Sequence, residues 1–218
     1  MRRDTFLRRW SQLHGGAAAT GLVRWWLGGV HALASPLAGA GVAPAVLTLL
    51  GLAAAVSAVA AGAAGGGWLA GAAALVVLAG VLDSLDGAVA VLSERTSRAG
   101  AVLDAVCDRL GDAACAVLLW VLGAPALLLL VGAGSSQVQE YARARAQAEG
   151  VREVGVVSVC ERPVRLALAA AAPAAVLARP DLREPLLLAA AGAWALLGVV
   201  ALGQVLVALR RGLRGAGS

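Results

Sequence analysis

Long apolar stretches recur along the chain, and they limit its possible folds more than any other feature. A run of about 20 mostly apolar residues has the length of a helix that crosses a bilayer. A backbone in lipid must satisfy its own hydrogen bonds, as a helix does. Six such stretches cover residues 44–64, 68–92, 99–122, 125–144, 163–178 and 184–209, the fifth being the shortest. The sequence therefore predicts an all-α integral membrane protein with six transmembrane helices.

Composition supports this fold class. The 218 residues are 60% hydrophobic and only 14% charged, whereas soluble domains are typically about 45–50% apolar and about 25% charged. Gly65–Gly67 and the Gly123–Pro125 segment separate consecutive stretches, as expected for tight turns. The many Gly and Ala residues favour close contact between helices.

The arginines predict how the helices are oriented. The net charge is +5, but the basic residues lie between apolar stretches rather than on one soluble face, so no nucleic-acid partner is expected. Positive residues collect on the cytoplasmic side of membrane proteins. Most arginines lie on one predicted side, in the N-terminal segment, two loops and the tail, and only Arg179 and Arg183 lie on the other. We expect a multi-pass protein of the cell (plasma) membrane with both termini in the cytoplasm.

The first forty residues do not contain a spanning stretch. Trp10, Trp25 and Trp26 alternate there with Leu and Arg at near-helical spacing, which suits an amphipathic helix in the membrane interface. An ordinary membrane-proximal segment is the alternative. We therefore divide the chain into an interfacial or juxtamembrane segment (1–40), a six-helix domain (41–210) and a cytoplasmic tail (211–218).

Four aspartates lie near the predicted cytoplasmic ends of the second and third spans. Asp83 and Asp86 are three residues apart, and Asp104 and Asp108 are four apart, so each pair shares one helical face. Because four converging carboxylates repel one another, a cation is expected among them. Oxygen ligands suit Mg²⁺ or Mn²⁺, and Mg²⁺ is commonly shared with substrate phosphates.

Two glycines flank these acids. Gly87 follows Asp86, and Gly100 lies one turn before Asp104; both leave room for a phosphate or nucleotide to approach the backbone. In the alternative interpretation, the acids are solvated helix ends or pair with Arg95, Arg98 and Arg109. Four acids in two matched pairs favour the metal site.

The spacing D-x-x-D-G-x-x-A-V-x8-G-x-x-x-D-x-x-x-D closely resembles the signature of the CDP-alcohol phosphotransferase family, which has Arg where this chain has Val91. The resemblance runs from about Gly41 to Leu166. It includes GVAPAVLTLLGL, similar to the family's G-x-x-P-N-x-x-T segment. It also includes YARARAQAEG and VCERPVRL, similar to a loop of actinobacterial members that make phosphatidylinositol phosphate or phosphatidylglycerophosphate.

The resemblance implies a six-helix membrane enzyme, commonly a homodimer, with its active site open to the cytoplasm. Such enzymes transfer a phosphatidyl group from CDP-diacylglycerol to an alcohol and release CMP. By position, Asp83, Asp86 and Asp104 would bind a first Mg²⁺ (or Mn²⁺), and Asp83, Asp104 and Asp108 a second. Asp108 would also be the general base. The CDP contacts would be Thr48, Gly87, Ser97 and Gly100.

The acceptor is expected to be a phosphorylated polyol, such as inositol phosphate or glycerol phosphate. Arg143 and Arg162 fall on positions where basic residues of the family meet the acceptor phosphate. Arginine suits paired phosphate contacts, although cytoplasmic loops carry arginines in any case.

Two departures from the family pattern leave alternatives open. Val91 replaces the family Arg that helps to hold the nucleotide phosphates, and Ala45 replaces an Asn. A non-catalytic homologue or partner subunit with weakened CDP binding is therefore one alternative. A small cation transporter is another, but the acids cluster near one membrane face only.

Overall fold

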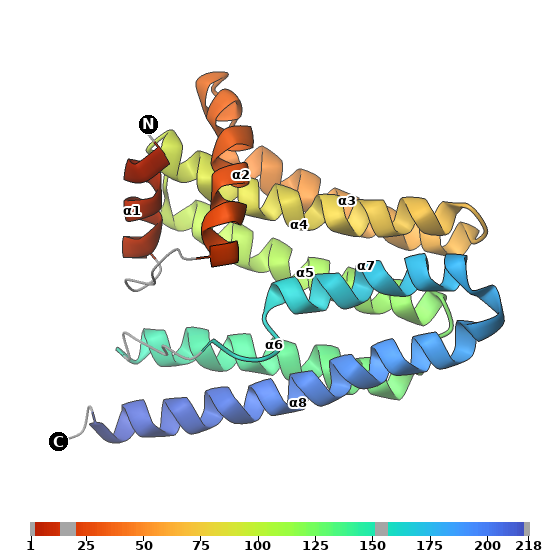
Figure 1. Ribbon diagram of the computed structural model, residues 1–218. Coiled ribbons are helices and arrows are strands. Elements are labelled where there is room, and N and C mark those ends of the chain that lie inside the picture. The colour runs from red at the N-terminus through yellow and green to blue at the C-terminus, as the bar shows by residue number, and fades with distance from the viewer. Residues whose placement is uncertain (1–2, 14–20, 151–156, 216–218) are drawn as a thin grey trace. The chain divides into compact units, whose positions relative to one another are not determined.

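A computed structural model of the chain describes residues 3–13, 21–150 and 157–215. Within those ranges its regular elements are all helical (Figure 1). They are α1 (Arg3–Leu13), α2 (Gly21–Gly39), α3 (Pro44–Ala64), α4 (Trp68–Leu92), α5 (Arg98–Val121), α6 (Ala126–Ala148), α7 (Arg162–Ala178), the short 3-10 helix η1 (Pro180–Leu182) and α8 (Arg183–Gly215). Parts of the predicted N-terminal segment (1–2 and 14–20) and of the tail (216–218) lie outside the described residues.

Each of the six predicted spans coincides with one helix, α3 to α8, with small differences at the ends. The predicted glycine turns are confirmed by left-handed backbone angles at Gly65 (φ 67°), Gly66 (φ 53°) and Gly123 (φ 100°). Glycine adopts this conformation without the steric cost of a side chain.

Three segments of the described chain are long and apolar enough to cross a membrane: Pro44–Ala64, Trp68–Leu92 and Pro180–Gly212. The other predicted spans carry features that weaken the apolar signal. α5 contains Asp104, Asp108, Arg109 and Asp112, and α7 has only 17 residues. The six-span count therefore stays a prediction.

The chain forms two compact units. The first comprises Met1–Ala54 and Leu78–Leu110. Its apolar core joins the N-terminal helices to the end of α4, and Phe6 is buried in it together with Leu85, Val89 and Val91. On α2, by contrast, Trp25 is 72% exposed. The N-terminal helices therefore bury part of their apolar surface against α4, and their place in the membrane interface stays a prediction.

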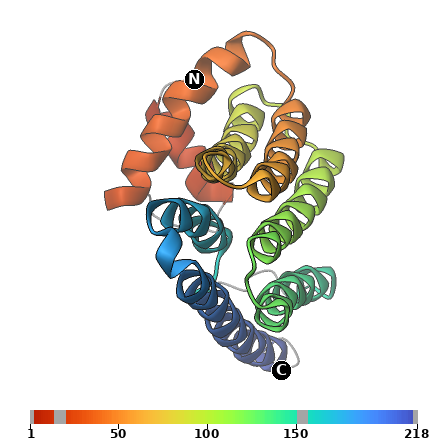
Figure 2. The same ribbon diagram turned by 90° about the vertical axis from the view of Figure 1, so that its right-hand side faces the viewer.

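The second unit comprises Ala55–Val77 and Gly111–Ser218. Its longest contact joins α6 and α8, which run side by side in both views (Figures 1 and 2). Glycines let the two backbones touch: a Cβ on Gly198 would lie 2.9 Å from the carbonyl oxygen of Gly132. Trp194 is fully buried beside this crossing.

Candidate metal and nucleotide site

Three of the four predicted aspartates converge in the first unit. Asp83 on α4 and Asp104 and Asp108 on α5 each contribute one carboxylate oxygen, and these oxygens all lie within 4.8 Å of one another. The i,i+4 spacing of Asp104 and Asp108 aligns their side chains on one face of α5. The three side chains are partly exposed, so a cation could reach them. This donor set suits a hard divalent cation.

Asp86 is not one of these three, and its carboxylate accepts two hydrogen bonds within the protein. The Thr48 hydroxyl on α3 donates to Asp86 Oδ2 at 2.7 Å, and the Gly87 backbone N–H donates to Oδ1 at 2.5 Å. Asp86 is 5% exposed and Thr48 8%. Thr48, predicted from the family pattern as a CDP contact, thus orients Asp86 in this structure. Its direct contact with CDP stays a prediction.

Ser97 and Gly100 form the start of α5. The Gly100 N–H donates to Ser97 Oγ at 3.0 Å, which is the bond of a serine that caps a helix N-terminus. A Cβ on Gly100 would lie 3.0 Å from this oxygen. Gly100 therefore keeps the cap unobstructed. Ser97 remains exposed, and both residues stay predicted CDP contacts.

Gly87 has different surroundings. It is exposed on α4. Apart from its sequence neighbours and the backbone of its own helix, no heavy atom of the described residues would lie within 4 Å of an added Cβ. Packing against the described residues therefore does not explain why a glycine stands here. Space for a ligand would explain it. This is the kind of surface that a bulky phosphate needs for close approach to a helix backbone.

The loop between α4 and α5 is held by the N-terminal part of the same unit. Glu94 has a left-handed backbone (φ 57°) and pairs with Arg9 of α1 at 2.9 Å. Arg95 donates to the Gly41 carbonyl oxygen at 3.3 Å. The loop that connects the two aspartate pairs is therefore tied to α1 and to the segment before α3.

The two predicted acceptor arginines lie in the second unit. Arg143 on α6 makes a paired contact with Glu161, its Nη2 lying 2.7 Å from Oε1 and its Nη1 3.2 Å from Oε2. Arg162 is the first residue of α7, and its Nη2 would lie 3.6 Å from a Cβ on Gly111 of α5. Arg143 is thus held by Glu161, and Arg162 lies close to the backbone of α5 at Gly111.

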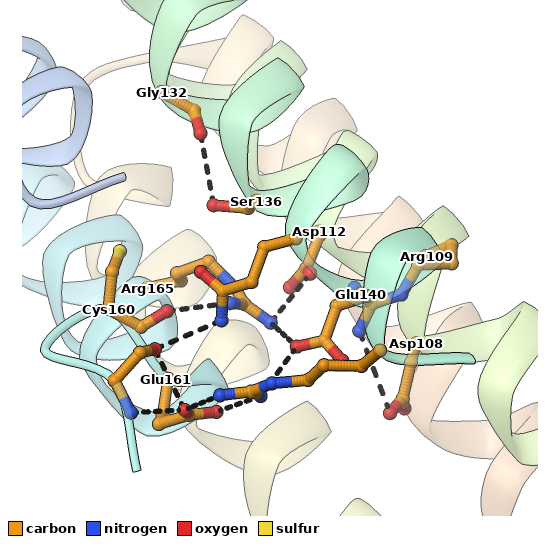
Figure 3. Close-up of polar contacts among 12 residues, drawn as sticks. Asp108, Arg109, Asp112, Gly132, Ser136, Glu140, Cys160, Glu161 and Arg165 are labelled. Atoms are coloured by element: carbon orange, nitrogen blue, oxygen red, sulfur yellow. Dashed lines mark hydrogen bonds and ion pairs between the residues drawn. The ribbon is translucent and has the colours of Figure 1, made fainter. Parts of the chain in front are cut away.

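A buried ion pair lies next to this group. Arg165 on α7 pairs with Asp112 on α5 at 3.0 Å, and both side chains are 1% exposed. Arg165 Nη1 also donates to the Cys160 carbonyl oxygen at 2.7 Å, and Glu140 lies 3.9 Å from its Nη2 (Figure 3). Breaking such a pair from one side leaves a buried charge uncompensated. We interpret Arg165 as a structural arginine.

Glu161 makes several polar contacts in this region, and the family pattern did not single it out. Besides Arg143, it accepts hydrogen bonds from Ser158 N at 2.7 Å and Ser158 Oγ at 2.8 Å. Burial raises the pKa of Glu161, but the hydrogen bonds from Arg143 and Ser158 outweigh it and hold the pKa below its ordinary value of 4.5. The sequence feature that could have indicated its role is its position directly before Arg162.

Comparison with known families agrees with the aspartate pattern. The model of the CDP-alcohol phosphatidyltransferase family matches residues 41–208. The chain belongs to this family. The matched range contains both the converging aspartates and the arginines of α6 and α7.

Relatives of this chain within the CDP-alcohol phosphatidyltransferase family are named as one specific enzyme. The phosphatidylinositol phosphate synthase of Mycolicibacterium smegmatis is 43% identical over 138 residues, which are 59% of this chain and 60% of that protein. The chain thus matches about three fifths of the length of this curated relative. That relative is named as an enzyme, which does not favour the non-catalytic alternative.

Solved structures give a broader match. A crystal structure of the Mycobacterium tuberculosis phosphatidylinositol phosphate synthase with manganese and citrate has a TM-score of 0.69 and 32% identity. The match covers 83% of this chain and 88% of that one. A structure of the same synthase with CDP-diacylglycerol bound has a TM-score of 0.67, also at 32% identity, with 83% and 92% covered.

Proposed function

We propose that this chain transfers a phosphatidyl group from CDP-diacylglycerol to a phosphorylated polyol and releases CMP. The observation that carries the proposal is the convergence of Asp83, Asp104 and Asp108 within 4.8 Å, at the positions of the family signature. Membership of the family supports the reaction class. The names of the relatives support inositol phosphate as the first acceptor to test, with glycerol phosphate as the second.

The reaction exchanges one phosphorus–oxygen bond for another. An acceptor hydroxyl oxygen bonds to the phosphorus that carries the diacylglycerol, and the bond from that phosphorus to the CMP oxygen breaks. Two divalent cations, Mg²⁺ or Mn²⁺, bound by Asp83, Asp86, Asp104 and Asp108 would neutralise the pyrophosphate and stabilise the leaving CMP. A structure of a relative that contains manganese supports a divalent metal.

The side chains of the chain take the remaining roles. Asp108 receives the proton of the acceptor hydroxyl as general base. Thr48 orients Asp86 through its 2.7 Å hydrogen bond, while Gly87, Ser97 and Gly100 form the surface against which CDP binds. Arg143 and Arg162 bind the acceptor phosphate, for which the arginine fork is well suited.

The proposed setting is the plasma membrane. We propose that α3 to α8 all cross it, with both termini and the active site on the cytoplasmic side and the N-terminal helices at the interface. Three segments that are apolar and long enough to cross and the distribution of arginines support this topology. We also propose a homodimer, as the resemblance to the family implies.

The test is CMP release by purified protein in detergent with CDP-diacylglycerol and Mg²⁺. The acceptors are inositol phosphate, inositol, glycerol phosphate, serine and phosphatidylglycerol, with Asp108→Asn as the control. Metal-dependent release with a phosphorylated polyol, absent in the control, is the expected result. Release with an unphosphorylated acceptor only would overturn the acceptor class. No release from well-folded protein would favour the non-catalytic alternative.

A further inference from the structure

Glu161 connects the two arginines to which the proposed function assigns the acceptor phosphate. It pairs with both terminal nitrogens of Arg143, and it is the N-cap residue of α7, directly before Arg162. Shorter polar side chains such as Asp or Ser at this position commonly accept a hydrogen bond from the first turn of their own helix. Here no such cap bond forms, and the carboxylate binds Arg143 and Ser158 instead.

The segment before α7 is fixed residue by residue. The Ser158 N–H and hydroxyl both donate to Glu161, and Gln139 Nε2 of α6 donates to Ser158 Oγ at 3.0 Å. The Val159 N–H donates to Gln204 Oε1 of α8 at 3.1 Å. Ser158 and Gln139 are buried, at 5% and 0% exposure. Glu161 therefore helps to fix the short polar segment from Ser158 to Glu161. The end of this segment sets the position of Arg162, the first residue of α7.

Charge compensation gives Glu161 a second effect. Arg143 has Glu161 at 2.7 Å and Glu140 at 3.6 Å, so two carboxylates offset its charge before a ligand arrives. A charge compensated in this way attracts phosphate less strongly over a distance, but its guanidinium is held in one orientation. Binding to a pre-oriented arginine costs less side-chain entropy than binding to a mobile one.

We infer that Glu161 is a positioning residue for the acceptor phosphate, because it fixes the guanidinium of Arg143 and the segment that leads into Arg162. The inference rests on the proposed function. It predicts a selective effect: loss of the carboxylate weakens binding of the phosphorylated acceptor and leaves binding of CDP-diacylglycerol unchanged. A residue that served only the stability of the fold would affect both substrates alike.

The experiment compares Glu161→Gln with Glu149→Gln. Glu149 is a matched control because it also pairs with an arginine of α6, Arg145, at 2.5 Å, but its side chain is 57% exposed. We expect Glu161→Gln to raise the KM for inositol phosphate about tenfold, in line with the loss of a charged hydrogen-bonded contact. The kcat at saturation, the KM for CDP-diacylglycerol and the whole of the Glu149→Gln kinetics should stay within about twofold.

A second variant tests the pair from its other side and keeps the inference testable if Glu161→Gln folds poorly. Arg143→Lys retains the charge but cannot make the two-pronged contact. We expect it to raise the KM for inositol phosphate as well, and we expect the double variant to be no worse than the more severe single variant. Fully multiplicative effects would show that the two residues act independently and would overturn the inference.

Direct binding of inositol phosphate, measured by calorimetry, separates the two proposals. If the unaltered protein neither turns over nor binds inositol phosphate, the proposed acceptor is wrong and the inference fails with it. If the unaltered protein binds and turns over inositol phosphate but Glu161→Gln behaves like Glu149→Gln, the inference alone is wrong. Equal losses for both substrates would also contradict it, because they indicate a role in stability only.

Discussion

Gly87 is a residue whose predicted role is contact with a ligand, because its packing against the described residues does not require a glycine. An added Cβ would meet no atom of another described element within 4 Å, and alanine is the better helix former by about 1 kcal/mol. The residue also follows Asp86, whose carboxylate is bound by Thr48 and by the Gly87 N–H itself. A glycine at this exposed site therefore costs stability without improving the packing.

The first prediction concerns Gly87→Ala. The variant should unfold at the same temperature as the unaltered protein or a higher one, because the methyl group meets nothing and favours the helix. Its KM for CDP-diacylglycerol should rise about tenfold or more, because the methyl group occupies space that the ligand needs. Thermal unfolding and CMP-release kinetics measure the two effects. Unchanged kinetics would show that Gly87 does not face the nucleotide.

The second prediction concerns Val91, which replaces the family Arg. Val91 is 9% exposed and belongs to the apolar cluster of Phe6, Leu85 and Val89. Val91→Arg should lower the free energy of unfolding by about 2 kcal/mol or more, because it places a charge in that cluster. Val91→Met adds volume without a charge, so it should lower the free energy of unfolding by less than Val91→Arg does.

Activity decides whether the substitution at position 91 is a loss or an adaptation. Because the valine is packed in the core of its unit, we expect Val91→Arg to give no gain in CMP release. An increase in turnover at an unchanged unfolding temperature would instead show that the arginine can reach the nucleotide, and that Val91 weakens the enzyme.

At the scale of elements, the crossing of α6 and α8 depends on glycine. A Cβ on Gly132 would lie 2.9 Å from the Ala195 nitrogen and 2.9 Å from the Trp194 carbonyl carbon, and these are backbone atoms that cannot rotate away. Small residues at such crossings let helices pack closely in membranes. Gly134 lies two residues along α6, and within the described part of the chain nothing outside its own helix would come within 4 Å of its Cβ position.

This contrast gives a third, paired prediction. Gly132→Ala should destabilise the protein by about 1–3 kcal/mol, because the helices must move apart. Gly134→Ala should be neutral or slightly stabilising. Thermal unfolding in one detergent compares the two variants directly. Equal unfolding temperatures would contradict the close backbone contact.

The segment between α6 and α7 predicts a fourth result, a dependence on pH. Glu161 has a lowered pKa when folded, so its ionised form stabilises the fold fully above its unfolded pKa. That contribution is lost as pH falls through the lowered folded value. The difference in unfolding temperature between the unaltered protein and Glu161→Gln should be constant from about pH 5 to 8 and shrink below about pH 4.5. A difference that persists to the lowest pH would contradict the ion pair with Arg143.

At the scale of the whole molecule, periodicity and length predicted the helices well. The residues 44–64 and 68–92 are reproduced as α3 and α4, because uniformly apolar stretches bounded by glycine turns leave the backbone few alternatives. The i,i+3 and i,i+4 spacing likewise predicted that acids from two helices would converge, and three of them do.

Other parts of the site depend on contacts that no spacing rule expresses. The pairing of Thr48 with Asp86 joins residues 38 positions apart, and Glu161 meets Arg143 from 18 positions away. The role of Ser97 as a helix cap was readable in principle, since serine directly precedes α5. The family pattern instead predicts that Ser97 contacts CDP.

The central claim is that the aspartates of α4 and α5 bind divalent metal and thereby support release of CMP from CDP-diacylglycerol. The most direct measurement is CMP release, with inositol phosphate as acceptor, by protein stripped with a chelator and then titrated with Mg²⁺ or Mn²⁺. Asp104→Asn, which neutralises one of the three converging carboxylates, is assayed beside it. We expect no release from the stripped protein, full recovery with metal, and a loss of at least about a hundredfold in the variant. Release that persists without metal, or that Asp104→Asn retains in full, would contradict the account.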